Sequence, residues 1–159
     1  IIKEPAQFVD QVHFYLQKED LRTSKEISSL IIEKFLKKNS EKPEGAWGSF
    51  GKMYSFAKDQ NLENYLGPLI KLTVESASRE KDRNERERKI EATLYQFYRL
   101  NDSFSPAQRK EIQETIAQTY LQLIDSTKHS QSANIYTLIQ GLHPSKKVLQ
   151  KADSLVLFK

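Results

Sequence analysis

The chain has 159 residues, of which 38% are hydrophobic and 29% are charged, and it contains no cysteine. A chain of this length buries enough apolar surface to fold without a disulfide or a metal. The absence of cysteine excludes disulfides, thiolate nucleophiles and cysteine-based zinc or iron–sulfur sites. The formal net charge is +4, and the excess comes from residues 128–159, which hold five lysines and one acidic residue.

We expect a single domain over residues 1–159, excised from a larger cytoplasmic protein, because the chain begins at Ile1 and ends on an apolar segment. No apolar run reaches the 18 or so residues that a membrane span needs, so we expect no transmembrane segment. A chain without cysteine also suits a reducing compartment.

Apolar residues at helical spacing predict four helices in the first half of the chain. The first follows Pro5 and the second follows Thr23, which forms a T-x-x-E capping box with Glu26. The second helix has so broad an apolar face that we expect it to be central. A turn-rich break covers residues 39–45, after which helical spacing resumes at Trp47 and again at Gly67–Pro68.

Residues 79–101 begin with dense charge and end with an apolar stripe. Opposite charges lie four residues apart in the first half, an arrangement that supports a helix by about 0.2–0.5 kcal/mol a pair. Ile90, Leu94, Phe97 and Tyr98 share one face of the second half. The pattern predicts one continuous helix, solvated at its start and packed at its end.

Ser105, Pro106 and Gln108 form the clearest helix start in the sequence, with a cap, a first-turn proline and a capping-box glutamine. A polar link is expected over residues 125–132, followed by a helix through Ile135 and a last helix from Ser145. Strand patterns are nearly absent. The sequence therefore predicts an all-α fold, an irregular multi-helix bundle or short helical array of about seven to eight helices.

No catalytic motif supports an enzyme. His13, His129 and His143 lack the spacing of a metal site, and the chain has no phosphate-binding loop and no nucleophile elbow. We therefore predict no catalytic residue, no metal and no cofactor.

Three groups of residues are candidate binding sites. Trp47 and Phe50 lie in an aromatic segment and fit either core packing or an exposed wedge that enters a partner groove or a lipid interface. Arg83, Arg86 and Arg88 lie in the charged stretch and are the candidates for contact with another protein. Nearby acidic residues cancel their charge, which argues against nucleic acid, because a phosphate backbone selects for net positive potential.

The third group is Lys146, Lys147 and Lys151, which flank the apolar stripe of the last helix. They fit either a solvated face or a site for an anionic ligand such as a phosphorylated headgroup. The main hypothesis is a non-catalytic helical module that mediates protein–protein interaction within a larger cytosolic protein. The alternative is an anionic-lipid (phosphoinositide) membrane-binding domain that uses the basic C-terminal helix. A helical regulator of a small GTPase is a further alternative, which the sequence neither supports nor opposes.

Overall fold

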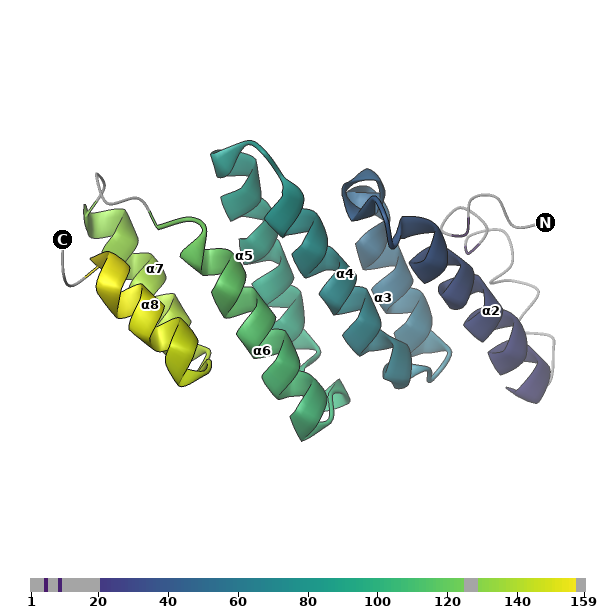
Figure 1. Cartoon of the computed structure of the whole chain (residues 1–159). Helices are drawn as coiled ribbons and strands as arrows, with labels where there is room; N and C mark the ends of the chain where they lie inside the picture. Colours follow the sequence, from purple (N-terminus) through teal and green to yellow (C-terminus); the bar gives the residue numbers. More distant parts are fainter. Residues whose placement is uncertain (1–4, 6–8, 10–20, 125–128, 157–159) are drawn as a thin grey trace. The chain divides into compact units, whose positions relative to one another are not determined.

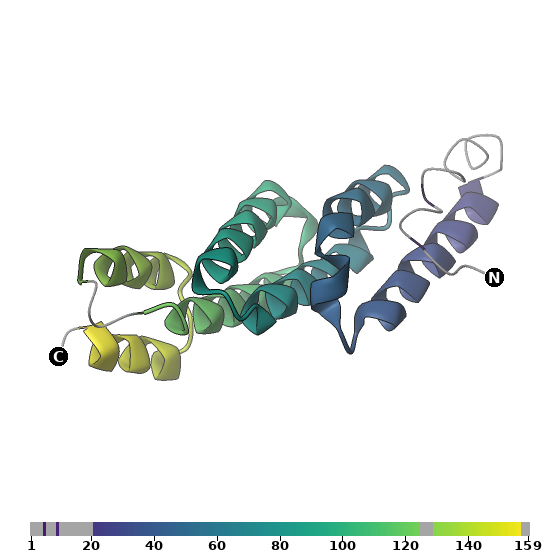
Figure 2. The same cartoon turned by 90° about the horizontal axis from the view of Figure 1, so that it is seen from above.

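The computed structural model describes residues 5, 9, 21–124 and 129–156 (Figures 1 and 2). Within these residues the chain forms seven α-helices, three short 3-10 helices and no strand. The all-α prediction is therefore confirmed. Most of the first predicted helix lies outside the described residues, although Pro5 and Val9 are helical and buried.

The chain divides into two compact units, residues 1–73 and 74–159, and each is described by itself. Their boundary falls inside helix α4 (Leu66–Arg79), so the two units share one continuous helix. Whether they fold as a single domain, as the sequence predicts, stays a prediction.

The first unit contains α2 (Leu21–Asn39), the 3-10 helix η1 (Pro43–Ser49), α3 (Phe50–Asp59), η2 (Glu63–Tyr65) and the first half of α4. Aromatic packing fixes α2 against the η1–α3 segment. Phe35 of α2 meets Phe50 edge-on at 5.7 Å between ring centroids. The hydroxyl of Tyr54 is buried and hydrogen-bonds to Thr73, and through this contact α3 is attached to α4.

Two local details of this unit bear on the sequence predictions. The capping box proposed at Thr23 is wrong, because α2 is already helical at Leu21 and Thr23 lies inside it. Asn61 ends α3 in the left-handed conformation, with φ of 57°. This allows the Leu62 N–H to bond back to the Ala57 carbonyl at 2.8 Å, which satisfies a helix-end acceptor.

The second unit contains the rest of α4, α5 (Arg83–Arg99), η3 (Asn101–Ser103), α6 (Pro106–Leu121), α7 (His129–Gly141) and α8 (Lys146–Val156). α7 and α8 lie side by side in both views, and both contact α6 (Figures 1 and 2). Fully buried side chains from α5, α6 and α7 form its core. They include Ile90, Phe97, Ile116, Tyr120 and Ile139.

The continuous helix predicted over residues 79–101 is partly wrong. α4 ends at Arg79 and α5 begins at Arg83, so a sharp turn interrupts the charged stretch. The side chain of Asp82 caps α5 by accepting a hydrogen bond from the Glu85 N–H at 2.9 Å. The packed half is confirmed, with Ile90, Leu94 and Phe97 buried, except that Tyr98 is 54% exposed.

The helix start at Ser105 is confirmed, and both hydrogen bonds of its capping box with Gln108 are present. The polar link predicted over residues 125–132 is wrong for its second half, because residues 129–132 belong to α7 (His129–Gly141), and residues 125–128 lie outside the described residues. Ser132 is 4% exposed and belongs to the helix.

Candidate binding cleft

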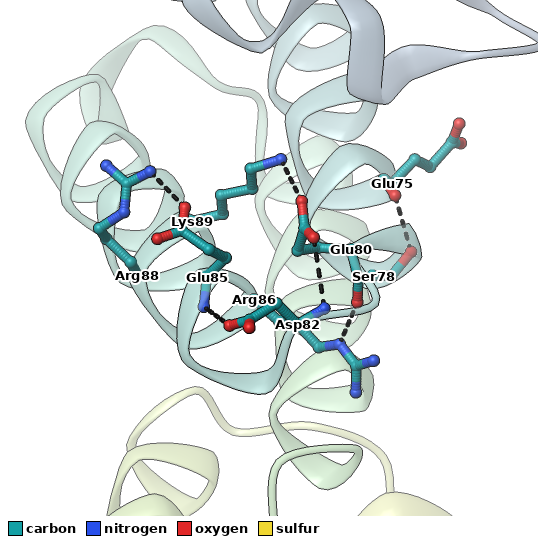
Figure 3. Close-up of polar contacts among 8 residues, drawn as sticks. All are labelled: Glu75, Ser78, Glu80, Asp82, Glu85, Arg86, Arg88 and Lys89. Atoms are coloured by element: carbon teal, nitrogen blue, oxygen red, sulfur yellow. Dashed lines mark hydrogen bonds and ion pairs between the residues drawn. The ribbon is translucent and has the colours of Figure 1, made fainter.

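Two of the three candidate arginines bind the ends of helices in their own unit. The guanidinium of Arg83 donates to the carbonyl of Leu123, just beyond the end of α6, and also pairs with Glu87 at 3.6 Å. Arg86 donates from Nε to the carbonyl of Glu80 at 2.9 Å, just beyond the end of α4 (Figure 3). Carbonyls at helix ends lack partners within the helix, so both arginines satisfy acceptors of the fold.

The same turn buries a lysine. Lys89 is 7% exposed, and its ammonium bonds to the Glu80 carboxylate at 2.8 Å (Figure 3). The Lys89 ammonium, followed by the Asp82 backbone N–H, lowers the pKa of the Glu80 carboxyl from its ordinary value of 4.5. The cations around this turn therefore hold α4, α5 and α6 in place.

Arg88 differs from its two neighbours. Its side chain is 66% exposed and lies on the outer side of α5, away from Glu80 (Figure 3). It pairs at 2.5 Å with Glu85, which is itself 46% exposed. Exposed pairs of this kind are worth roughly 0–1 kcal/mol, so Arg88 can exchange its partner at little cost.

The two aromatic candidates also lie in different environments. Phe50 is 2% exposed and packs between Phe35 and Trp47. Of the two alternatives, core packing or an exposed wedge, its position fits core packing. Trp47 is half-buried, with its ring centroid 6.0 Å from that of Phe50. A wedge built from both rings would require Phe50 to leave the core of the first unit.

The three candidate lysines belong to α8, an amphipathic helix that buries Val148 and Ala152. Two contacts fix this helix to its neighbours. Asp153 accepts a hydrogen bond from the Tyr136 hydroxyl of α7 at 2.5 Å. Glu114 of α6 accepts from both the backbone N–H and the hydroxyl of Ser145, each at 2.6 Å, immediately before α8.

Lys146, Lys147 and Lys151 are all exposed, and none of their side chains forms a hydrogen bond or an ion pair with any described residue. Their placement is locally unfavourable. Lys146 and Lys147 lie in the first turn of α8, which has no acidic residue, although the helix dipole favours negative charge there. Lys147 and Lys151 are one turn apart, so they also repel each other.

A cleft of about 410 Å³ lies between α6 and α8 and brings two of these lysines together with residues of α6. Its lining residues are Glu114, Gln118, Leu121, Gln122, Ser145, Lys147, Val148 and Lys151. Leu121 is half-buried and Val148 is buried, so the cleft has an apolar base. Two cations, two amides and one carboxylate surround that base.

This lining fits a ligand that carries negative charge and a polar backbone. Lys147 and Lys151 present ammonium groups, and the amides of Gln118 and Gln122 offer both donors and acceptors. Glu114 already accepts two hydrogen bonds from Ser145, so its carboxylate has a structural role at the edge of the cleft. The cleft offers no pair of groups arranged for proton transfer or nucleophilic attack.

The sequence pointed to the lysines but missed the α6 side of the cleft. Glu114, Gln118 and Gln122 are polar positions on a helix, and no motif distinguishes them from other surface residues. Ser145 was placed only as the start of the last helix. The contact between Glu114 and Ser145 spans 31 positions of sequence, so local patterns could not predict it.

A second cleft of about 410 Å³ in the first unit is lined by Pro5, Lys34, Lys37, Lys38 and Glu41. Lys37 and Lys38 lie in the last turn of α2, where the helix dipole favours cations. Their placement therefore has a structural explanation, which the lysines at the start of α8 lack. Lys34 and Lys37 are both exposed.

Across the described ranges, no group of three or more His, Asp or Glu side chains is arranged to hold a metal ion. No helix in that part of the chain is both long and apolar enough to cross a membrane. Comparisons of the chain with protein-family models, curated proteins and solved structures found no match.

Proposed function

We propose that this chain is a non-catalytic binding module, part of a larger cytosolic protein, that engages an acidic segment of another protein at the α6–α8 cleft. The observation that carries the proposal is the contrast between paired and unpaired cations. Arg83, Arg86 and Lys89 bind groups of their own fold, whereas Lys147 and Lys151 line a cleft and bind nothing in the described part of the chain.

The charge arrangement on α8 supports this proposal. Lysines in the first turn of a helix, one turn from another lysine, lower local stability slightly. A local arrangement that opposes stability without a structural gain is a mark of functional positions. A ligand carboxylate between Lys147 and Lys151 would remove their repulsion.

The lining of the cleft favours a peptide over a simple anion. An extended segment has backbone N–H and C=O groups that match the amides of Gln118 and Gln122. An apolar side chain of the ligand would cover Leu121 and Val148. The anionic-lipid alternative with Phe50 as its insertion wedge would require this side chain, 2% exposed, to leave its buried position, whereas Trp47 is only half-buried.

Binding at this site should be weak and sensitive to salt, since exposed charges are screened within about 10 Å at 0.1 M ionic strength. The test probe is a fluorescent peptide with glutamates on either side of one leucine, measured by anisotropy at two salt concentrations. The same peptide with lysines in place of the glutamates should not bind.

The decisive variant is Lys147→Glu with Lys151→Glu, which should abolish binding of the glutamate peptide. Lys34→Glu with Lys37→Glu makes the same change of charge on α2 and should leave binding intact. If both variants lost peptide binding equally, the loss would be explained by net charge alone, and the proposal would be overturned. Vesicles with and without phosphoinositides form the other arm, and binding to the vesicles without binding to the peptide would favour the lipid alternative.

A further inference from the structure

The outer face of α5 carries an exposed stripe with few contacts among the described residues: Arg88 pairs with Glu85, and the ring of Tyr98 lies 5.6 Å from that of Phe97. Seven residues at helical spacing form this stripe, and all are exposed: Arg88, Glu91, Ala92, Tyr95, Tyr98, Arg99 and Asp102. At 3.6 residues per turn, the six of them that belong to α5 lie within about 60° of one line along the helix. Asp102 lies just past the helix end, in η3.

Two large aromatic side chains lie at the middle of this stripe. Tyr95 is 67% exposed and Tyr98 is 54% exposed, the two highest values among the exposed large hydrophobic residues described. Tyrosine is enriched at the centres of protein–protein interfaces, where it covers a large area at small cost in side-chain entropy. The stripe therefore has the composition of a contact surface.

The charges of the stripe are self-complementary about Tyr95. Glu91 lies four residues before Tyr95 and Arg99 four residues after it, with opposite sign. Arg88 and Asp102 lie seven residues before and after it, again with opposite sign. In an antiparallel pair of identical helices related by a twofold axis at Tyr95, each residue faces the one equally far on the other side.

We propose that the outer face of α5 pairs with the same face of a second copy of this chain, antiparallel, with the twofold axis at Tyr95. Glu91 then meets Arg99 of the second copy, and Arg88 meets Asp102 of the second copy. The two Tyr95 rings pack on the axis, flanked by Tyr98 and by the small Ala92. Symmetry makes every charge pair occur twice.

The groups required for this pairing are available. The side chains of Glu91, Arg99 and Asp102 form no hydrogen bond or ion pair with any described residue. Arg88 is bound only to the exposed Glu85, an exchangeable contact. A face of this size would bury on the order of 1,000 Å² in total, near the lower limit for specific interfaces, so the dimer should be weak and concentration-dependent.

Charge swapping across the axis tests the pairing. Glu91→Arg alone places like charges opposite each other twice, and so does Arg99→Glu alone. In sedimentation equilibrium each single variant should raise the dimer dissociation constant at least about tenfold. The double variant Glu91→Arg with Arg99→Glu should restore the dimer, and a mixture of the two single variants should form a heterodimer.

A thiol probe locates the axis independently of charge. The native chain has no cysteine, so Tyr95→Cys introduces a single thiol on the proposed axis. Under mild oxidation it should form a disulfide-linked dimer rapidly, whereas Ala107→Cys, at an exposed position of α6, should not.

A chain that stays monomeric up to high concentration, or a dimer that ignores both charge reversals, would overturn the proposal. Equal cross-linking of both cysteine variants would do the same. The α5 face and the α6–α8 cleft share no residue, so either proposal can fail without the other.

Discussion

The turn between α4 and α5 and the surface of α8 are both rich in cations, yet they use them in opposite ways. At the turn, Arg83, Arg86 and Lys89 are at least partly buried and bind carbonyls or carboxylates of their own fold. On α8, Lys147 and Lys151 are exposed beside a cleft and bind no described residue. The sequence alone does not distinguish these two groups of basic residues. The burial of each side chain and the group it binds do distinguish them.

This difference predicts that removing cations from the turn costs stability, while removing them from α8 costs only binding. The largest effect should come from Arg83→Ala, which removes the guanidinium that donates to the Leu123 carbonyl and pairs with Glu87. Loss of such a partner costs about 1–3 kcal/mol of the free energy of unfolding. Urea denaturation followed by circular dichroism measures it.

Arg88→Ala is the matched control for that experiment, because it removes the same side chain from an exposed position of the same helix. We expect a change within about 0.5 kcal/mol. Equal losses in both variants would show that Arg83 has no special role in the fold.

Glu114 lines the cleft but should also matter for stability. Glu114→Ala removes both hydrogen bonds to Ser145 and should lower the free energy of unfolding by about 1 kcal/mol. Glu114→Gln keeps an acceptor for Ser145 and should recover part of this loss. Thermal unfolding of both variants checks the order, and an unchanged midpoint in Glu114→Ala would contradict it.

The Glu80–Lys89 pair predicts a pH dependence confined to acid. The pKa of Glu80 is lowered in the fold, so the unfolded chain takes up the proton first as pH falls. The contribution of this pair is complete above the ordinary carboxyl pKa of 4.5 and is lost as pH falls below it towards the folded value.

Glu80→Gln should therefore be less stable than the native chain at neutral pH and converge with it in acid. The free energy of unfolding, measured between pH 3 and 7, gives both curves. A difference that stays constant across this range would show that the carboxylate does not titrate against Lys89.

The smallest effect on stability should follow from Lys147→Gln with Lys151→Gln. These side chains form no hydrogen bond or ion pair with any described residue, and the change removes their mutual repulsion, so the midpoint of thermal unfolding should stay the same or rise slightly. Binding of the glutamate peptide should nevertheless be lost. A clear fall in stability would place these lysines with the cations of the turn.

The sequence predicted a local feature correctly where all of its interacting groups lie within four consecutive residues. The capping box of Ser105 and Gln108 is complete within one turn of helix, and the structure confirms it. Thr23 and Glu26 have the spacing of a capping box, but Thr23 lies inside α2, which is already helical at Leu21. The break at residues 80–82 was missed, since alternating charges favour helix on both sides of it.

Long-range contacts lay beyond any local pattern. Arg83 reaches Leu123 across 40 positions, and Glu114 reaches Ser145 across 31. The sequence identifies the basic residues but does not predict which of them bind other groups within the folded chain. That distinction separates the cations that bind groups of the second unit from those that bind no described residue.

The position of α4 has a practical consequence for cutting the protein into pieces. Because the boundary after Thr73 falls in the middle of a helix, a fragment ending there would leave one half of α4 on each piece with an unsatisfied end. Shortened versions for expression or isotope labelling should therefore begin before Leu66 or stop after Arg79. Each piece would then carry the whole helix.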